Sequence, residues 1–257
     1  MKAVATFLGT GTSTGVPTLG CRCRVCTSSD PRDQRLRPSL WLRFSGGHNV
    51  VIDTTPDFRT QALRAGIPAL DAVLYTHSHA DHIMGLDDIR PFNFGRPDPL
   101  PVYANAGTLA DLRRVFQYVF ENNYPASAIP RIAVHALTGP VELFGVSIEP
   151  LEVMHGALPV LAYRFGANAY VTDVSEIPPA AIERLRGLDV LILDALRVRP
   201  HPTHSHLANS LRLVAELAPR RAYFTHIAHE LPHAETEAAL PAGVRLAYDG
   251  LQLEIEV

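Results

Sequence analysis

The sequence predicts an α/β domain, and three features of the 257-residue chain support this prediction. Short apolar runs rich in Val, Ile, Leu and Tyr recur along the chain and end in turn or polar residues, as buried strands do. Helical patterns separate several of these runs, and strands that alternate with helices are typical of α/β folds. Apolar residues make up 47% of the chain and charged residues 19%, which suits a protein with a substantial core.

The expected strands and helices follow directly from these patterns. Apolar runs predict strands within residues 4–9, 49–54, 72–77, 146–153, 169–173, 189–196, 221–227 and 245–257. Helical periodicity predicts helices over residues 55–65, 108–121, 179–188 and 207–218. In the 108–121 segment we expect Phe116 and Phe120 to pack in the core, with a dimer contact or a substrate lid as the alternatives.

Two segments are too rich in Gly, Pro, Ser, Thr or Arg for regular structure, namely residues 9–37 and 91–101. Long loops inside a compact domain are usually functional or held by another part of the protein. Neither an internal repeat nor a low-complexity linker is present, so we expect residues 1–257 to form one domain.

Charge and composition exclude several classes of function. The net charge is −3 and the isoelectric point is about 6.4, which gives no support for bulk attraction to nucleic acid or to an anionic membrane. No apolar run approaches the length of a membrane span, and the first residues do not resemble a signal peptide. The three cysteines lie within Cys21–Cys26, a spacing that indicates metal ligation or free thiols in a cytoplasmic protein.

The strongest functional signal is the stretch THSHADHIMGL, which follows the strand predicted at residues 72–77. It places His77, His79, Asp81 and His82 close together at a strand end. Imidazole and carboxylate groups suit zinc, manganese or iron. Such a cluster cannot be buried without a cation to satisfy its polar atoms.

Three more potential ligands occur at the ends of other predicted strands: His155, Asp173 and His226. Ligands in α/β sheets gather at the carboxyl ends of strands. Added to the cluster, they provide three histidines and one aspartate for one metal and two histidines and two aspartates for a second, with Asp173 shared.

The pattern His-x-His-x-Asp-His, followed by His155, Asp173 and His226, resembles the metallo-β-lactamase-fold hydrolases. The stretch FLGTG at residues 7–11 and Asp53 resemble the phosphodiesterase branch of that family. The resemblance implies a four-layer αββα sandwich with its metals at one edge. It also implies the ligand sets, which are His77, His79 and His155 for one ion, Asp81, His82 and His226 for the other, and Asp173 between them.

The cysteine stretch GCRCRVC narrows the resemblance to the phosphoribosyl 1,2-cyclic phosphate phosphodiesterases of bacterial phosphonate breakdown. In those enzymes, three cysteines in this spacing and a distant histidine hold a structural zinc. The resemblance therefore implies a zinc-binding loop at about residues 18–30 whose ligands are Cys21, Cys23, Cys26 and His229. Three thiolates and one imidazole favour a closed tetrahedral zinc site.

A two-metal site can bridge a hydroxide between its ions and stabilise both oxygens of an in-line displacement, which suits a phosphodiester. Asp81 is placed to orient the nucleophile as well as to bind metal. The leaving oxygen needs a proton, and the resemblance assigns that role to His204, with His206 as a rival and His201 nearby. Manganese at the paired site, a small phosphodiester substrate and a homodimer are implied by the resemblance alone.

Three other readings remain open at this stage. A nuclease that processes tRNA 3′ ends shares the fold but needs a long basic arm, and no such insertion is evident. A thioester, lactone or β-lactam hydrolase of the same fold is the second, and a non-catalytic scaffold is the third. The complete ligand set argues against the scaffold.

Other polar residues receive no role from the sequence. The turn at residues 9–15 lacks the Gly-Lys-Ser/Thr ending of a nucleotide-binding loop. Arginines that could bind a terminal phosphate remain unassigned, namely Arg35, Arg37 and Arg90. Three histidines are expected to be structural or exposed: His48, His135 and His233.

Overall fold

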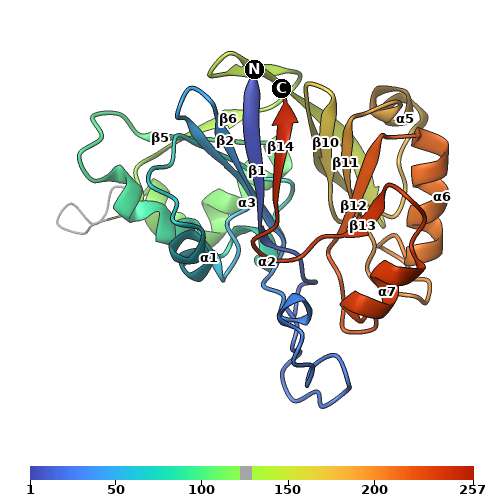
Figure 1. Ribbon diagram of the computed structural model, residues 1–257. Coiled ribbons are helices and arrows are strands. Elements are labelled where there is room, and N and C mark those ends of the chain that lie inside the picture. The colour runs from blue at the N-terminus through green and yellow to red at the C-terminus, as the bar shows by residue number, and fades with distance from the viewer. Residues whose placement is uncertain (122–128) are drawn as a thin grey trace.

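Two β-sheets pack face to face at the centre of the computed structural model, which describes residues 1–121 and 129–257 (Figure 1). The strands of the first sheet are, in spatial order, β14 (Gln252–Glu256), β1 (Lys2–Gly9), β2 (Ser39–Phe44), β3 (Asn49–Ile52), β4 (Ala72–Leu74), β5 (Leu100–Ala104) and β6 (Ile132–Ala136). Those of the second are β13 (Val244–Leu246), β12 (Arg221–Thr225), β11 (Val190–Asp194), β10 (Asn168–Val171), β9 (Leu158–Phe165), β8 (Val146–His155) and β7 (Val141–Leu143).

Helices cover the outer face of each sheet, so the predicted αββα sandwich is confirmed (Figure 1). The helical segments before the second sheet are η1 (Pro31–Asp33), α1 (Phe58–Ala65), α2 (Ala80–Ile83), η2 (Leu86–Asn93), α3 (Ala106–Val115) and α4 (Gln117–Phe120). The later ones are α5 (Pro179–Leu185), α6 (Leu207–Leu217) and α7 (His233–Ala239). In the described residues, no helix is both long and apolar enough to cross a membrane.

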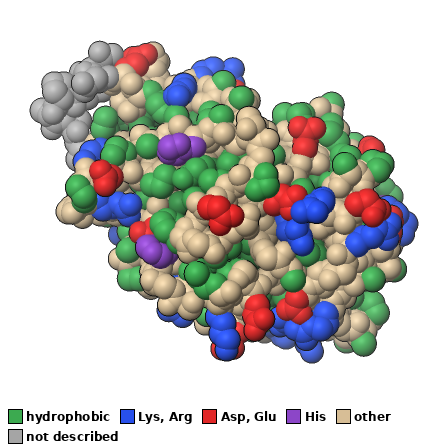
Figure 2. Space-filling view, turned by 90° about the horizontal axis from the view of Figure 1, so that it is seen from above, with side chains coloured by type: hydrophobic (Ala, Val, Ile, Leu, Met, Phe, Trp, Pro, Cys, Tyr) green, Lys and Arg blue, Asp and Glu red, His purple; other side chains and the backbone are tan. Residues whose placement is uncertain are grey.

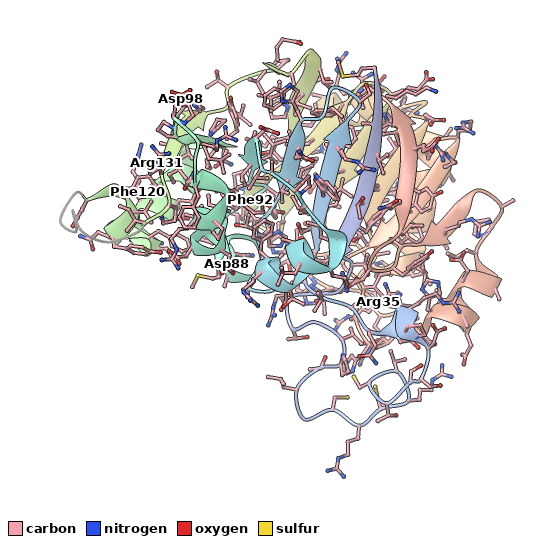
Figure 3. The ribbon with its side chains drawn as sticks, turned by 60° about the vertical axis from the view of Figure 1, so that its left-hand side comes forward. Arg35, Asp88, Phe92, Asp98, Phe120 and Arg131 are labelled. Atoms are coloured by element: carbon pink, nitrogen blue, oxygen red, sulfur yellow. The ribbon has the colours of Figure 1, made fainter. Side chains whose placement is uncertain are left out.

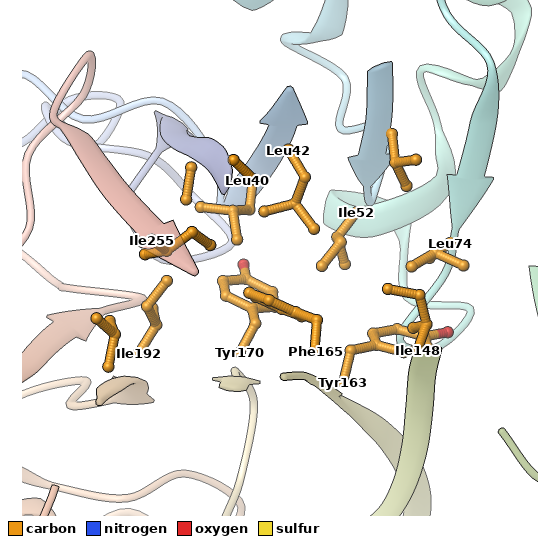
Figure 4. Close-up of a cluster of buried hydrophobic side chains, with 14 of the residues drawn as sticks. Leu40, Leu42, Ile52, Leu74, Ile148, Tyr163, Phe165, Tyr170, Ile192 and Ile255 are labelled. Atoms are coloured by element: carbon orange, nitrogen blue, oxygen red, sulfur yellow. The ribbon is translucent and has the colours of Figure 1, made fainter. Parts of the chain in front are cut away.

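The core between the two sheets follows from the alternation of side chains along each strand. Leu40 and Leu42 of β2 point inward and lie opposite Tyr170 of β10 and Phe165 of β9 (Figure 4), while Trp41 between them points outward to the α1 side. Burying each such side chain contributes about 1.5–3 kcal/mol. Apolar contacts therefore hold the two sheets together, and the polar residues at the strand ends are not needed for this packing.

Strand direction decides where that site lies. β10, β11 and β12 are parallel to one another, and β8 runs the same way because it is antiparallel to β9, which is antiparallel to β10. Their carboxyl ends therefore lie at one edge of the sheet. At this edge β3 and β4, also parallel, contribute from the first sheet. The chain termini lie at the opposite end, where β1 begins and β14 ends (Figure 1).

Three predicted elements differ from those observed. The helix expected over 108–121 is split between α3 and α4 at Phe116, whose backbone φ of −109° and ψ of 42° leave the helical region. The helix expected from residue 55 begins at Phe58, because the Thr55 hydroxyl accepts the backbone N–H of Asp57 and forms a turn there. The run at 245–257 forms the end of β13 and then β14, which belong to different sheets.

Candidate metal centre

The THSHADHIMGL stretch forms a tight loop between β4 and η2 that presents its ligands from two directions. His77 follows β4, whereas Asp81 and His82 come from the single turn of α2. The loop closes at Gly85, whose backbone N–H donates to Thr54 O at 2.9 Å. A Cβ atom at Gly85 would lie 2.1 Å from the Thr55 carbonyl oxygen, so only glycine fits this approach.

Four predicted ligands form one buried group, with all their ligand atoms within 4.8 Å of one another: Asp81, His82, Asp173 and His226. His82 Nε2 lies 3.3 Å from Asp81 Oδ2 and 3.3 Å from Asp173 Oδ2. His226 Nε2 lies 3.2 Å from Asp173 Oδ1. Around an ion with bonds near 2.1 Å, neighbouring ligand atoms are about 3.0–3.4 Å apart, so these spacings fit a bound ion.

The other three predicted ligands form a second group within the same 4.8 Å limit: His77, His79 and His155. His77 and His155 are buried, whereas His79 is exposed. His155 Nδ1 lies 2.7 Å from the Thr203 carbonyl oxygen, which fixes the orientation of its ring and leaves Nε2 for a ligand. A carboxylate oxygen of Asp173 lies within 4.8 Å of a ring nitrogen of His155, so Asp173 lies near both the buried group and the three-histidine group.

The chemistry of these groups fits a cation. In the described residues, His77 Nε2, His82 Nε2 and both ring nitrogens of His226 are buried without a hydrogen-bond partner. A buried polar atom without a partner costs about 1–3 kcal/mol. Metal ions at the two groups would remove that cost, and the donor set of imidazoles and carboxylates suits zinc, manganese or iron.

The charges within the buried group also favour a bound cation. Burial lowers the pKa of His226, but Asp173 and Asp81 outweigh this effect and raise it to about 9. Burial also opposes the charged form of His82, yet Asp173 and Asp81 raise its pKa well above the ordinary value. The negative charges of Asp173 and Asp81 therefore stabilise a positive charge beside them, either a proton or a divalent cation.

Backbone strain marks the same positions. Asp53, Asp173 and His226 adopt positive φ angles of 64°, 53° and 58°, which non-glycine residues rarely do. Such conformations cost about 1–3 kcal/mol each and are concentrated at functional sites. Asp53 is not itself in either ligand group, but its Oδ2 lies 2.7 Å from His82 Nδ1 and its Oδ1 accepts the Thr76 N–H. Asp53 therefore orients the His82 ring through Nδ1, which leaves Nε2 directed at the buried group.

His204 joins the site, whereas His206 does not. His204 lies close to Asp173 and His155, and its ring stacks on His226 with centroids 4.6 Å apart. His206 is the cap residue before α6 and has no contact with either ligand group among the described residues. His201 lies at the rim, 5.2 Å from the His204 ring.

Asp194 is a site residue that the sequence analysis missed. It ends β11, and its Oδ2 lies 2.8 Å from His204 Nδ1 and accepts the Val174 N–H at 3.1 Å. Its Oδ1 lies 4.0 Å from His226 Nδ1. The signal was present, because Asp194 is a polar residue at the carboxyl end of an apolar strand, the same pattern that identified Asp173 and His226.

The cysteine loop brings its four predicted ligands together. His229 Nδ1 lies 3.3 Å from Cys21 Sγ, 3.4 Å from Cys23 Sγ and 3.3 Å from Cys26 Sγ. A tetrahedral zinc with Zn–S near 2.3 Å and Zn–N near 2.0 Å places sulfur and nitrogen about 3.5 Å apart. The Cys26 backbone N–H lowers the pKa of the Cys23 thiol to about 6, so this sulfur is readily available as a thiolate.

The residues left unassigned by the sequence have structural contacts. Arg37 pairs with Asp57 and Arg90 with Asp87. Two histidines stack on aromatic rings, His48 on Phe144 and His135 on Tyr103. Arg35 and His233 are buried in contact with each other.

A match between the chain and the sequence profile of a known family shows the family to which it belongs. The profile of the beta-lactamase superfamily domain matches residues 48–227, which include His77 to His226. The chain belongs to this superfamily. The predicted resemblance to metallo-β-lactamase-fold hydrolases is therefore confirmed.

Comparison with individual proteins refines this placement. A crystal structure of a new diphosphatase from the PhnP family is 52% identical, with a TM-score of 0.94, and covers 99% of this chain and 98% of that chain. Zinc-bound PqqB from Methylobacterium extorquens is 21% identical with a TM-score of 0.79, over 98% of this chain and all of that one, and shows the shared fold. An octanoyltransferase from Porphyromonas gingivalis is 40% identical over 97% of this chain, and the chain spans 51% of its length.

Proposed function

We propose that this chain is a two-metal phosphoesterase that hydrolyses a small phosphodiester or diphosphate, with phosphoribosyl 1,2-cyclic phosphate as the first substrate to test. One observation carries the proposal, namely the two ligand groups joined at Asp173 with His204 beside them. The 52% identity to a diphosphatase of the PhnP family supports chemistry at phosphorus. In both candidate bonds, water attacks phosphorus and an oxygen leaves.

Each residue has a role in this proposal. His77, His79 and His155 would hold one ion, Asp81, His82 and His226 would hold the other, and Asp173, which lies near both groups, would be shared between them. Divalent ions bound there supply an activated water and neutralise charge that develops on the phosphoryl oxygens. Manganese is the ion that the family resemblance favours.

Proton transfer falls to the chain's own side chains. Asp81, whose side chain is 11% exposed at the edge of the buried group, would orient the attacking water, and His204 would donate a proton to the leaving oxygen. Asp194 holds Nδ1 of His204 at 2.8 Å, which leaves Nε2 to face the substrate. The His204 ring lies 4.5 Å from the His155 ring and 4.6 Å from the His226 ring, between centroids, which supports its role as the acid beside the proposed metal centre.

The cysteine loop is proposed to bind a structural zinc through Cys21, Cys23, Cys26 and His229. The sulfur-to-nitrogen distances of 3.3–3.4 Å support this assignment. Zinc would tie a loop near the start of the chain to a residue more than 200 positions later, which restricts the unfolded chain and stabilises the fold.

A nuclease that grips tRNA is less well supported. The net charge of −3 is unfavourable for a nucleic-acid surface. On the face that carries the chain termini, Lys and Arg side chains are interspersed with Asp and Glu (Figure 2). Acyl transfer is not assigned either, because the chain spans 51% of the octanoyltransferase.

The homodimer, the cytoplasmic location and the single domain expected from the sequence are part of this proposal. Sedimentation at several protein concentrations tests the dimer, and cell fractionation tests the location. Limited proteolysis tests the domain, because a second folded unit would survive as a separate fragment.

The substrate experiment compares phosphoribosyl 1,2-cyclic phosphate, a dinucleoside diphosphate and an aryl phosphodiester with manganese-loaded protein. Efficient opening of the cyclic ester supports the named substrate. Turnover of the diphosphate alone keeps the phosphoesterase and discards the cyclic ester. Failure of all three, with hydrolysis of a thioester or lactone instead, would contradict the proposal.

A further inference from the structure

Arg35 is a buried arginine at the junction between the sandwich and the cysteine loop (Figure 3). Only 2% of the residue is exposed. Its Nη1 donates to the Thr10 hydroxyl at 2.8 Å and to the Ala247 carbonyl at 2.7 Å, and its Nη2 lies 3.0 Å from His233 Nδ1. One guanidinium therefore joins three segments that are far apart in the sequence.

Burial of the positive charge of Arg35 costs free energy. In the described residues its Nε has no hydrogen-bond partner, and the contacts of its two Nη atoms are with a hydroxyl, a backbone carbonyl and an imidazole. Burial lowers its pKa to about 10. The charges of Asp249 and Asp33 partly offset this effect. The rigid, forked guanidinium also makes several contacts at once, which lysine cannot do.

From Arg35, a short chain of contacts leads to the metal centre. Thr10 receives the Arg35 hydrogen bond, donates its hydroxyl to Asp249, and accepts the Ile227 N–H with its carbonyl at 2.8 Å. The Thr12 N–H in turn donates to Ile227 O at 3.1 Å. Ile227 is thus held on both sides, immediately after His226, whose strained φ of 58° needs such support.

In the other direction, Arg35 closes the base of the cysteine loop. Its backbone pairs with Val16 through hydrogen bonds of 2.9 Å and 2.7 Å, so the segment between them, which carries all three cysteines, begins and ends at this bridge. The neighbouring Asp33 accepts the His233 N–H at 2.8 Å. His233 begins α7, shortly after the predicted zinc ligand His229.

We propose that Arg35 is a positioning residue that couples the cysteine loop to His226, so that an ordered loop raises the affinity of the buried ligand group for its metal. The inference rests on the proposed metal centre and zinc loop, and it adds an energetic connection between them. Loss of order in the loop would then weaken the ion held by Asp81, His82 and His226 more than the ion held by the three-histidine group.

The first test replaces Arg35 with methionine and with lysine and measures retention of each ion against a competing chelator. A residue that acts on a metal ligand through intervening contacts typically changes the affinity roughly 2- to 30-fold. We expect Arg35→Met to lower the affinity of one of the two active-site ions by that factor while zinc stays bound. Arg35→Lys should give a smaller loss and covers the case in which the methionine variant does not fold.

Arg64→Met is the matched control. Arg64 also contacts Asp249, at 3.3 Å, but its side chain is 41% exposed and it does not touch Thr10. We expect this variant to keep both active-site ions at wild-type affinity. Equal losses in the Arg64 and Arg35 variants, or equal loss of both ions in Arg35→Met, would overturn the proposal.

A double-mutant cycle tests the coupling itself. Cys23→Ser disorders the loop, whereas Arg35→Met removes the side chain that connects the loop to His226, so their effects on the affinity of the weakened ion should not add. Full additivity would overturn the coupling. Because the readout is metal affinity, this result is independent of the substrate, whereas a protein that binds no active-site metal at all would refute the proposed function instead.

Discussion

Replacement of Asp194 by asparagine tests the proton-donor assignment most sharply. Asp194 is fully buried and its Oδ2 lies 2.8 Å from His204 Nδ1. Asparagine keeps the size of the side chain and an oxygen that can accept the Val174 N–H, but it removes the negative charge. The variant should therefore fold and retain its metals while it loses the anion that orients and stabilises a cationic His204.

The expected loss follows from the strength of that contact. Hydrogen bonds to charged groups contribute about 1.5–3 kcal/mol, which corresponds to roughly 10- to 150-fold in rate if the contact is needed in the transition state. The loss should depend on the leaving group. A poor leaving group such as an alkoxide needs the proton from His204, whereas 4-nitrophenolate leaves without it.

The assay measures kcat for an alkyl and an aryl phosphodiester with wild type, Asp194→Asn and His204→Gln. We expect the alkyl ester to lose roughly 10- to 150-fold in Asp194→Asn and the aryl ester only a few-fold. Metal content measured on the same samples is the control, since Asp194 also faces His226. Equal losses for both esters with full metal content would refute the reasoning.

Four further predictions test other parts of the site. Asp173→Ala should abolish activity and lower active-site metal content while zinc stays bound; an active variant would refute the bridging role. Cys23→Ser should lower the thermal midpoint and remove about one zinc per chain by elemental analysis, and unchanged zinc would contradict the loop assignment. Gly85→Ala should cost about 1–3 kcal/mol or more in denaturant unfolding, because its Cβ would meet the Thr55 carbonyl at 2.1 Å; Gly139→Ala, with nothing within 4 Å, is the control. Burial and then Arg35 lower the pKa of His233 to about 4, against about 6.5 when unfolded. The unfolded chain therefore binds more protons between these values, so stability should fall by about 3 kcal/mol from pH 6.5 to 4, and His233→Gln should remove that part of the pH dependence.

The candidate metal ligands could be predicted from the sequence because they follow a simple rule. His155, Asp173 and His226 each follow an apolar run, and strand ends on one edge converge whatever the loops between them do. The same periodicity predicted most strands and the two helices α5 and α6. Periodicity did not predict the break at Phe116, because the amphipathic pattern continues through the residue at which the helix ends.

The supporting residues could not be predicted in the same way. Arg35 contacts His233, 198 positions away, and Thr10 contacts Asp249, 239 positions away. No local pattern reports such pairs, because only the packing of β14 beside β1 and of α7 beside the cysteine loop creates them. The choice of His204 over His206 also required the fold, since the first packs against His226 and the second caps α6.

The most direct test of the paired metal centre is the number of metal ions bound to the purified protein, measured by elemental mass spectrometry beside Asp173→Ala and Cys23→Ser. We expect about three divalent ions per wild-type chain, one in the cysteine loop and two at the paired centre. Asp173→Ala should then retain about one ion, the zinc, and Cys23→Ser should lack that zinc. A wild-type protein with no ion beyond the one that Cys23→Ser removes would contradict the paired metal centre.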